Sequence, residues 1–509
     1  GCGDRVAIIG DRNGALVWAI LGILKAGAVF SIFDPAYPPQ RLYDQLSTLT
    51  PAGLVVTPTQ LDLNDVLDSG KKELLNLKCR IHLPEIGMPA CSELTSYPAD
   101  TFESTYNSED PAYVVFTSGT TGKPHAISGK HAPVSHFLQW YQDAYMIKAQ
   151  DRFSMLSGLG HDPLLRDIFT PLWCGACICI PDNNDIFTPG NLAKWMKDRE
   201  ISFCHMTPAM VPLLCAIPPG TQNSISLPKL RHIVMGGDRL RYADVDKLTR
   251  IAPQAQCSNA YGTTETPQIM AFNPIAAATR KEINTTAADD SRILPIGKGI
   301  PEAQILILSD TKKLAGIGEL GEIYIRTPYL TDGYLNNTAL TCQNYITNPL
   351  SDIPGDIIYK TGDLGRYLPD GRVVFCGRTD GQIKLRAFRI ETESIIEALL
   401  DIPTITQAVV SLKTAEDKDS YLAAFIVCSA DTPLKSTEIR EHLLSRLPEY
   451  MVPMAFITVD QIPLTLNGKV NYDALPDPEE HEILANKDLT PPRSPYEIML
   501  LDIWREVLH

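Results

Sequence analysis

The residue types between positions 117 and 124 point most directly to chemistry. The run consists of Thr117, Ser118, Gly119, Thr120, Thr121, Gly122, Lys123 and Pro124. Bare backbone N–H groups, hydroxyl donors and one mobile positive charge together suit a polyphosphate. The apolar run 112–116 before it predicts a buried strand. We therefore expect the loop at a strand end, where α/β proteins commonly bind ligands.

The run does not fit a Walker A loop. That loop requires glycine where this chain has Thr117, and Ser or Thr where it has Pro124. An ordinary turn rich in Gly, Ser and Thr would have the same composition. The loop by itself does not exclude such a turn, but further motifs along the chain favour a phosphate site.

These motifs resemble, in order, those of the adenylate-forming enzymes: acyl-CoA synthetases, luciferases and the adenylation domains of nonribosomal peptide synthetases. The loop at 117–124 resembles the phosphate loop of that family. The other matching segments are 24–28 with 34–38, 259–266, 318–322 with 333–336, 359–364, 377–384, 447–453 and 466–470. A single match of this kind is weak, whereas seven or more in order are hard to obtain by chance.

The resemblance implies an ATP-dependent ligase that uses Mg²⁺ and joins a carboxylate to AMP. Negative charge develops around the α-phosphorus, where positioned cations and donors stabilise it. Lys469 is the implied catalytic cation, Glu265 the Mg²⁺ ligand and Asp363 the acceptor for both ribose hydroxyls. The implied adenine contacts are stacking on Tyr261 and an edge contact from Asn259. The other implied ATP-binding residues are the loop 117–123, Ala260, Gly262, Thr263 and Arg378.

Residue type alone leaves a structural alternative for each of these assignments. Glu265 is otherwise a turn carboxylate, Tyr261 a core tyrosine and Asp363 part of an Asx turn. Lys469 is otherwise a surface lysine that follows an Asn-Gly turn.

The segment 160–169 resembles the motif that grips the substrate in amino-acid-activating relatives, where an aspartate binds the α-ammonium group. Asp162 supplies that carboxylate here, and His161 is expected to shape the pocket entrance. The other pocket positions, carried over by motif, are Pro163, Arg166, His205, Val234, Gly236, Ala260, Gln268 and Ile269.

Arg166 makes this set unusually polar. Its guanidinium fork fits a second carboxylate on the substrate, unless it pairs with Asp162 or Asp167 instead. The pattern at 161–167 resembles α-aminoadipate reductase-type synthetases, which implies a small zwitterionic or dicarboxylic acid. A neutral aliphatic amino acid would leave these charges buried and unpaired.

The region after Asp380, the implied hinge, is expected to move between an adenylating and a thioester-forming pose. The thioester would form on the phosphopantetheine arm of a carrier protein, in cis or in trans. Two residues depart from the family pattern, because Ala387 stands in place of Gly and Ser394 in place of Glu. A methyl group at a close-approach position is expected to hinder that second half-reaction.

Composition limits the class of protein. The net charge of −15 and the lack of a basic stripe argue against a nucleic-acid partner, and no apolar run has the length of a membrane span. The scattered cysteines predict a cytoplasmic protein with reduced thiols. Cys174, Cys177 and Cys179 could suggest a metal, but a buried strand over 172–180 is favoured.

Alternating strand and helix patterns predict an α/β fold with parallel sheets, followed by a β-rich portion and a small mobile α+β domain. Strands are expected at 5–9, 28–32, 54–56, 322–325, 373–375 and 422–427, and helices at 18–25 and 394–400. The predicted domains are 1–379, the adenylation core; 380–480, which carries Lys469; and 481–509, a linker and the start of a carrier-protein domain.

Two further functions stay open at this level. One is a free-standing acyl-CoA synthetase of the same superfamily, and the other is a catalytically silent nucleotide-binding module. The motifs at 259–265 and 447–453, with the Asn-Gly-Lys at 467–469, favour an adenylation domain of a modular synthetase.

Overall fold

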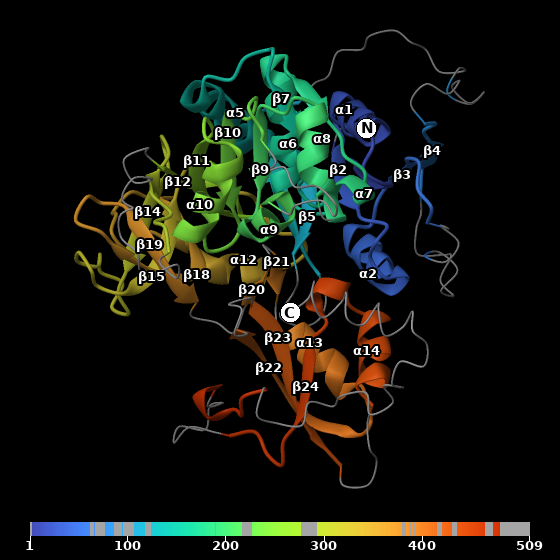
Figure 1. The fold of residues 1–509 in the computed structure, drawn as a ribbon, viewed down its shortest axis with the longest axis vertical. Helices are drawn as coiled ribbons and strands as arrows, with labels where there is room; N and C mark the ends of the chain where they lie inside the picture. Colours follow the sequence, from blue (N-terminus) through green and yellow to red (C-terminus); the bar gives the residue numbers. More distant parts are fainter. Residues whose placement is uncertain are drawn as a thin grey trace. The chain divides into compact units, whose positions relative to one another are not determined.

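The structure is a computed structural model. It describes residues 3–61, 66, 77–85, 94, 106–117, 124–188, 190–215, 226–275, 293–378, 383–385, 388–390, 392–414, 420–429, 435–463 and 472–478. The chain divides into an N-terminal unit, Gly1–Glu391, and a C-terminal unit, Thr392–His509. Figure 1 shows the elements of each unit. The predicted hinge at Asp380 and the segment 481–509 lie outside the described residues, so the predicted domain boundaries stay predictions.

The first sheet of the N-terminal unit has the strand order β16-β6-β5-β2-β1-β3-β4 among the described residues. β1 pairs in parallel with β2 and β3, and β2 with β5, whereas β6 is antiparallel to β5 and β16. The bounds are β1 Arg5–Ile9, β2 Val29–Phe33, β3 Gly53–Val56, β4 Cys79–His82, β5 Pro111–Thr117, β6 His125–Lys130 and β16 Gly333–Tyr334. The strands predicted at 5–9, 28–32, 54–56 and 112–116 are thus confirmed.

The second sheet has the order β13-β12-β11-β10-β9-β7-β8 and is parallel from β11 to β8. Its strands are β7 Arg152–Ser154, β8 Cys177–Cys179, β9 Phe203–Met206, β10 His232–Gly236, β11 Gln256–Thr263, β12 Thr266–Pro274 and β13 Lys298–Gly299. β9 and β10 lie inside the sheet and are buried on both faces, as a doubly covered parallel sheet requires.

Helices flank the two sheets. They are α1 Gly14–Lys25, α2 Pro39–Leu49, α5 His131–Tyr145, α6 Pro163–Cys174, α7 Asn183–Phe187, α8 Asn191–Asp198, α9 Val211–Cys215, α10 Tyr242–Ile251 and α12 Thr338–Asn344. α1 confirms the predicted helix and is capped by Asn13, whose side chain accepts a hydrogen bond from Leu16 N. α6 has Pro163 in its first turn and ends at Gly175, which is left-handed.

The buried strand predicted over 172–180 is wrong in its first part. Leu172 and Trp173 belong to α6 and are exposed, and β8 is an edge strand with Cys177 exposed and Cys179 buried. The apolar letters continue across the helix end, so the sequence pattern alone did not reveal the turn at Gly175. Among the described residues, no group of three or more His, Cys, Asp or Glu is arranged to hold a metal ion.

The β-rich portion is an antiparallel sheet with the order β14-β15-β18-β17, and β19 pairs with β18. The bounds are β14 Gln304–Leu308, β15 Gly321–Arg326, β17 Tyr345–Thr347, β18 Ile357–Tyr367 and β19 Val373–Arg378; β20 Ile383–Leu385 and β21 Phe388–Ile390 form a separate hairpin. The strands predicted at 322–325 and 373–375 are confirmed.

The C-terminal unit is the predicted small α+β domain. β22, β23 and β24 form its sheet, which is antiparallel between β22 and β23 and parallel between β23 and β24. The elements are α13 Thr392–Leu400, β22 Ile405–Thr414, β23 Ser420–Cys428, α14 Ser436–Leu444 and β24 Ala455–Thr458. The core of this unit contains Phe425 and Ile457. In the described part of the chain, no helix is both long and apolar enough to cross a membrane.

Candidate active site

The predicted ribose residue, Asp363, lies at the centre of a buried polar cluster. Its Oδ2 accepts a hydrogen bond of 2.6 Å from the Tyr261 hydroxyl, and Arg378 forms an ion pair with its Oδ1. The β18–β19 register places Arg378 opposite Asp363, and β11 brings in Tyr261. Burial raises the pKa of Tyr261 well above its ordinary value, so the phenol stays protonated. A carboxylate is an acceptor suited to ribose hydroxyls, and the ribose role of Asp363 stays a prediction.

Asn259 is buried on the same strand, two residues before Tyr261. Its amide nitrogen donates to the carbonyl oxygens of Pro295, at 2.8 Å, and Leu294, at 3.3 Å. These contacts fix the side chain and use its amide nitrogen, so a contact with an adenine edge would be made by the carboxamide oxygen. The adenine role of Asn259 stays a prediction.

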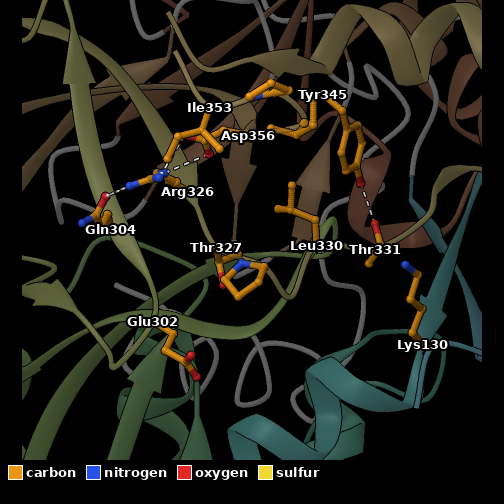
Figure 2. A pocket seen from close by; sticks show the side chains of 14 residues that line it. Lys130, Glu302, Gln304, Arg326, Thr327, Leu330, Thr331, Tyr345, Ile353 and Asp356 are labelled. Carbon is orange, nitrogen blue, oxygen red and sulfur yellow. Dashed lines mark hydrogen bonds and ion pairs between the residues drawn. The ribbon is translucent and has the colours of Figure 1, made fainter. Parts of the chain in front are cut away.

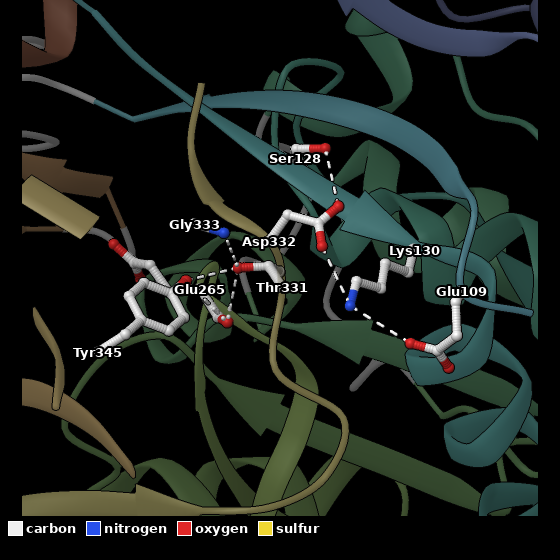
Figure 3. Close-up of polar contacts among 8 residues, drawn as sticks. All are labelled: Glu109, Ser128, Lys130, Glu265, Thr331, Asp332, Gly333 and Tyr345. Carbon is white, nitrogen blue, oxygen red and sulfur yellow. Dashed lines mark hydrogen bonds and ion pairs between the residues drawn. The ribbon is translucent and has the colours of Figure 1, made fainter. Parts of the chain in front are cut away.

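Glu265, the predicted Mg²⁺ ligand, is fully buried in the turn between β11 and β12. The Tyr334 hydroxyl donates to its Oε1 at 2.8 Å, and Thr331 Oγ1 donates to its backbone carbonyl at 3.0 Å. Figure 3 shows Thr331 beside Glu265, with Tyr345 on the same side of Thr331 as Glu265. A carboxylate is a hard oxygen donor, and one hydroxyl, that of Tyr334, donates to this one. Its chemistry therefore fits Mg²⁺.

Asp162 is positioned by residues from the β11–β12 turn and β12. Thr264 donates from its hydroxyl to Oδ1 at 2.9 Å, and Gln268 donates from Nε2 to the backbone carbonyl of Asp162 at 3.2 Å. Asp162 precedes α6 without making a side-chain cap hydrogen bond, so its carboxylate is not used by the helix. Burial raises the pKa of Asp162, while Arg166 and the Thr264 hydroxyl act in the opposite direction.

Arg166 follows Asp162 by one turn of α6 and is half-buried. Among the described residues it forms no ion pair, and its buried Nε has no hydrogen-bond partner. The alternative pairing with Asp162 or Asp167 is therefore not observed. Asp167 instead accepts hydrogen bonds from the Ser157 backbone N–H and from His205, at 2.8 and 2.7 Å.

His205 has both ring nitrogens occupied. Nδ1 lies 2.7 Å from Asp167 Oδ1, and Nε2 lies 2.8 Å from the Tyr141 hydroxyl. Burial lowers the pKa of His205, so the ring is neutral; Nδ1–H donates to the carboxylate and Nε2 accepts from the phenol. The ring of the predicted pocket residue His205 is therefore held in one orientation by Asp167 and Tyr141.

The strand register places the remaining predicted pocket residues together. Val234 lies opposite His205, and Gly236 lies opposite Ala260 on the neighbouring strand. Ile269 packs in the same apolar cluster as Val234 and Ala260. A Cβ on Gly236 would lie 2.7 Å from the Ala260 carbonyl oxygen, so the close approach of these strands requires glycine.

Comparison with known proteins agrees with this arrangement. The family model described as "AMP-binding enzyme" matches residues 1–335, about two thirds of the chain, and that described as "AMP-binding enzyme C-terminal domain" matches 394–469. This chain belongs to the AMP-binding enzyme family. It is an ATP-dependent acid-activating enzyme with the adenylate-forming fold.

The relatives of this AMP-binding enzyme include much longer proteins. L-2-aminoadipate reductase of Schizosaccharomyces pombe is 34% identical over 541 residues, with 95% of this chain and 38% of that protein covered. Tyrocidine synthase 3 of Brevibacillus parabrevis is 33% identical, with 99% and 7% covered. The structure of holo-PA1221, "an NRPS protein containing adenylation and PCP domains", is similar with a TM-score of 0.74, 24% identity, and 93% and 75% covered. The chain thus spans well under half of these two curated relatives.

His161 directly precedes Asp162 in the chain. Its Nε2 is 3.4 Å from the Tyr37 hydroxyl, and burial together with Arg41 lowers its pKa to about 4. A histidine with that pKa is neutral near pH 7 and is a poor base. The expected role of His161 at the pocket entrance stays a prediction. The assignment of Pro163 and the other pocket residues to binding of the acid also stays a prediction.

Several predicted site residues lie outside the described residues. They are the phosphate-loop positions 118–123, the hinge Asp380 and the catalytic candidate Lys469. Thr117 is described and ends β5, which places the loop at a strand end as predicted.

A surface cavity of about 690 Å³ lies outside this set of residues. Figure 2 shows Arg326 on its wall between Gln304 and Asp356, with hydrogen bonds of 3.0 and 2.9 Å. None of the predicted nucleotide or acid residues lines it, although Thr331 and Tyr345 do. The Arg326 guanidinium is already paired with Asp356. We therefore do not assign this cavity as the binding site of the acid.

The sequence interpretation missed several residues of the site. Thr264, Tyr141, Thr331 and Tyr334 all contact predicted site residues. Thr264 and Tyr334 lie inside matched motifs, at 259–266 and 333–336, which was an available signal. Tyr141 lies on α5, far from any motif, so the sequence offered no signal that it contacts the site.

Proposed function

We propose that this enzyme activates an amino acid that carries a second acidic group. The proposal depends on two residues of opposite charge. Asp162 is a buried carboxylate, and Arg166 is a cation that forms no ion pair among the described residues. The first fits a substrate ammonium and the second a distal carboxylate. L-2-aminoadipate, named by several relatives, has both groups.

A neutral amino acid fits this pocket less well. Its apolar side chain would leave the half-buried Arg166 guanidinium without a direct ion-pair partner among the described residues, which is unfavourable for a desolvated charge. His205 offers no ring N–H to a distal carboxylate, since its two ring nitrogens are engaged with Asp167 and Tyr141. Selection therefore rests on Arg166.

The proposed chemistry is in-line substitution at the α-phosphorus of ATP. A carboxylate oxygen of the substrate bonds to that phosphorus, the bond to the bridging oxygen breaks, and pyrophosphate leaves with its electron pair. Asp363 holds the ribose, the loop 118–123 holds the β- and γ-phosphates, and the Lys469 ammonium offsets the charge of the two anionic reactants. Glu265 would hold Mg²⁺, which when bound supplies charge neutralisation for the phosphates.

The proposed second step transfers the acyl group to a carrier protein. The phosphopantetheine thiolate attacks the acyl carbon, a thioester forms, and AMP leaves. Ala387 and Ser394, which depart from the family pattern, are expected to slow this step rather than adenylation. We further propose a cytoplasmic enzyme, because the cysteines in the described part of the chain are all free thiols.

An ATP–pyrophosphate exchange assay with a panel of amino, keto and dicarboxylic acids tests this function. We expect exchange to be fastest with an amino dicarboxylic acid. Exchange that is fastest with a neutral amino acid would contradict the substrate class. No acid-dependent exchange with any member of the panel would instead support a silent nucleotide-binding module.

A further inference from the structure

A short segment, residues 331–335, holds Glu265 from two sides; we call it the strap. Thr331 donates through Oγ1 to the Glu265 carbonyl oxygen at 3.0 Å, and Tyr334 donates to the carboxylate Oε1 at 2.8 Å. The Tyr345 hydroxyl lies 2.5 Å from Thr331 Oγ1 and donates to the same Glu265 carbonyl oxygen at 3.4 Å. Backbone and side chain of Glu265 are therefore fixed by the same five residues.

The strap also pairs with β6, a strand of the first sheet. Within it, Asp332 N donates to Ser128 O at 3.0 Å, and Leu335 N donates to Ala126 O at 2.7 Å. Figure 3 shows Asp332 reaching Ser128 and Lys130 on β6, on the other side of Thr331 from Glu265. β6 begins at His125, directly after the phosphate loop in sequence. The strap thus joins Glu265 to the strand that follows the loop.

The direction of the Tyr334 hydrogen bond is fixed by a neighbour. Asn344, at the end of α12, donates from Nδ2 to the Tyr334 hydroxyl oxygen at 3.2 Å. An amide nitrogen can only donate, so the single phenolic proton is left for Glu265. Tyr334 is buried, which keeps water from competing for either bond. The result is a relay from Asn344 through Tyr334 to the carboxylate.

We propose that Tyr334 and Asn344 are positioning residues that orient the Glu265 carboxylate toward the Mg²⁺ that accompanies ATP. This inference rests on the proposed role of Glu265 as the metal ligand. A hydrogen bond to one carboxylate oxygen restricts rotation of the group and presents the other oxygen in a fixed direction. The backbone hydrogen bonds of the strap to Ser128 and Ala126 keep that direction constant relative to β6.

The test measures metal binding directly, with Mn²⁺ as the probe. Electron paramagnetic resonance of the full chain with ATP and Mn²⁺ gives the Mn²⁺ affinity of the ternary complex. Calorimetry gives the affinity for ATP at a series of free Mg²⁺ concentrations. Tyr334→Phe keeps the ring and removes the donor, so we expect metal affinity to fall about tenfold. Tyr329→Phe is the matched control, since that hydroxyl contacts Glu302 on the surface.

A second variant covers the case in which Tyr334→Phe does not fold. Asn344→Asp replaces the amide donor with an acceptor that competes for the phenolic proton, and we expect weaker metal binding from it as well. If Glu265→Gln weakens metal binding while Tyr334→Phe and Asn344→Asp match the wild type, the relay is refuted. If Glu265→Gln itself leaves metal binding unchanged, the proposed ligand role of Glu265 fails instead.

Discussion

Burial raises the pKa of Asp162, and individual neighbouring residues modify that shift. Thr264 donates to Asp162 Oδ1, and Arg166 acts on the same carboxylate through its charge, so both lower the pKa of Asp162 against the effect of burial. Glu265 acts in the opposite sense and raises that pKa. If Asp162 binds the substrate ammonium as proposed, only its ionised form does so, and these neighbours then influence the pH below which the acid no longer binds.

Removing the Thr264 hydroxyl should therefore move the acid limb of activity. In Thr264→Val the ionised form of Asp162 loses a hydrogen bond, its pKa rises further, and we expect the acid limb of kcat/KM for the acid to shift to higher pH. The pH profile of pyrophosphate exchange measures this. Thr264→Ser keeps the donor and should retain the wild-type profile; identical profiles for Val and Ser would show that the hydroxyl does not act on Asp162.

At the scale of elements, β10 and β11 approach each other closely at two of the predicted pocket residues, Gly236 and Ala260. A methyl group at Gly236 would meet the Ala260 carbonyl oxygen at 2.7 Å, and backbone of this kind cannot move aside cheaply. We expect Gly236→Ala to reduce the free energy of unfolding by about 1–3 kcal/mol and to raise the KM for the acid.

Gly22 provides the control for this prediction. It lies in α1 with nothing within 4 Å of an added Cβ, so Gly22→Ala should stabilise by about 0.5–1 kcal/mol with an unchanged KM. Urea unfolding and exchange kinetics distinguish the two variants. Equal stability changes at positions 22 and 236 would contradict the packing described here.

The elements that the sequence predicted well are those with a local signal. Apolar runs such as 5–9 and 112–116 became β1 and β5, and the helical spacing at 18–25 became part of α1. The Asp167–His205–Tyr141 contacts join α6, β9 and α5, so their pairing depends on tertiary packing that no local pattern encodes. The same holds for Tyr334, whose motif was identified without its partner Glu265.

At the scale of the whole molecule, the proposed functions are divided between the two units. Asp162, Glu265 and Asp363 belong to the N-terminal unit, whereas Lys469 belongs to the C-terminal unit. If Lys469 acts on the developing charge alone, Lys469→Ala should reduce exchange by at least about 100-fold and leave ATP binding by calorimetry nearly unchanged. Unchanged exchange, or a parallel loss of ATP binding, would rule out that role.

The central claim is that Arg166 selects a second carboxylate, and a comparison of two substrates tests it most directly. The measurement is kcat/KM for 2-aminoadipate and for 2-aminohexanoate, which lacks the distal carboxylate, in the wild type and in Arg166→Ala. We predict that the preference for 2-aminoadipate falls roughly 10–100-fold in the variant, as expected for the loss of a hydrogen-bonded ion pair. An equal loss with both substrates would contradict the account.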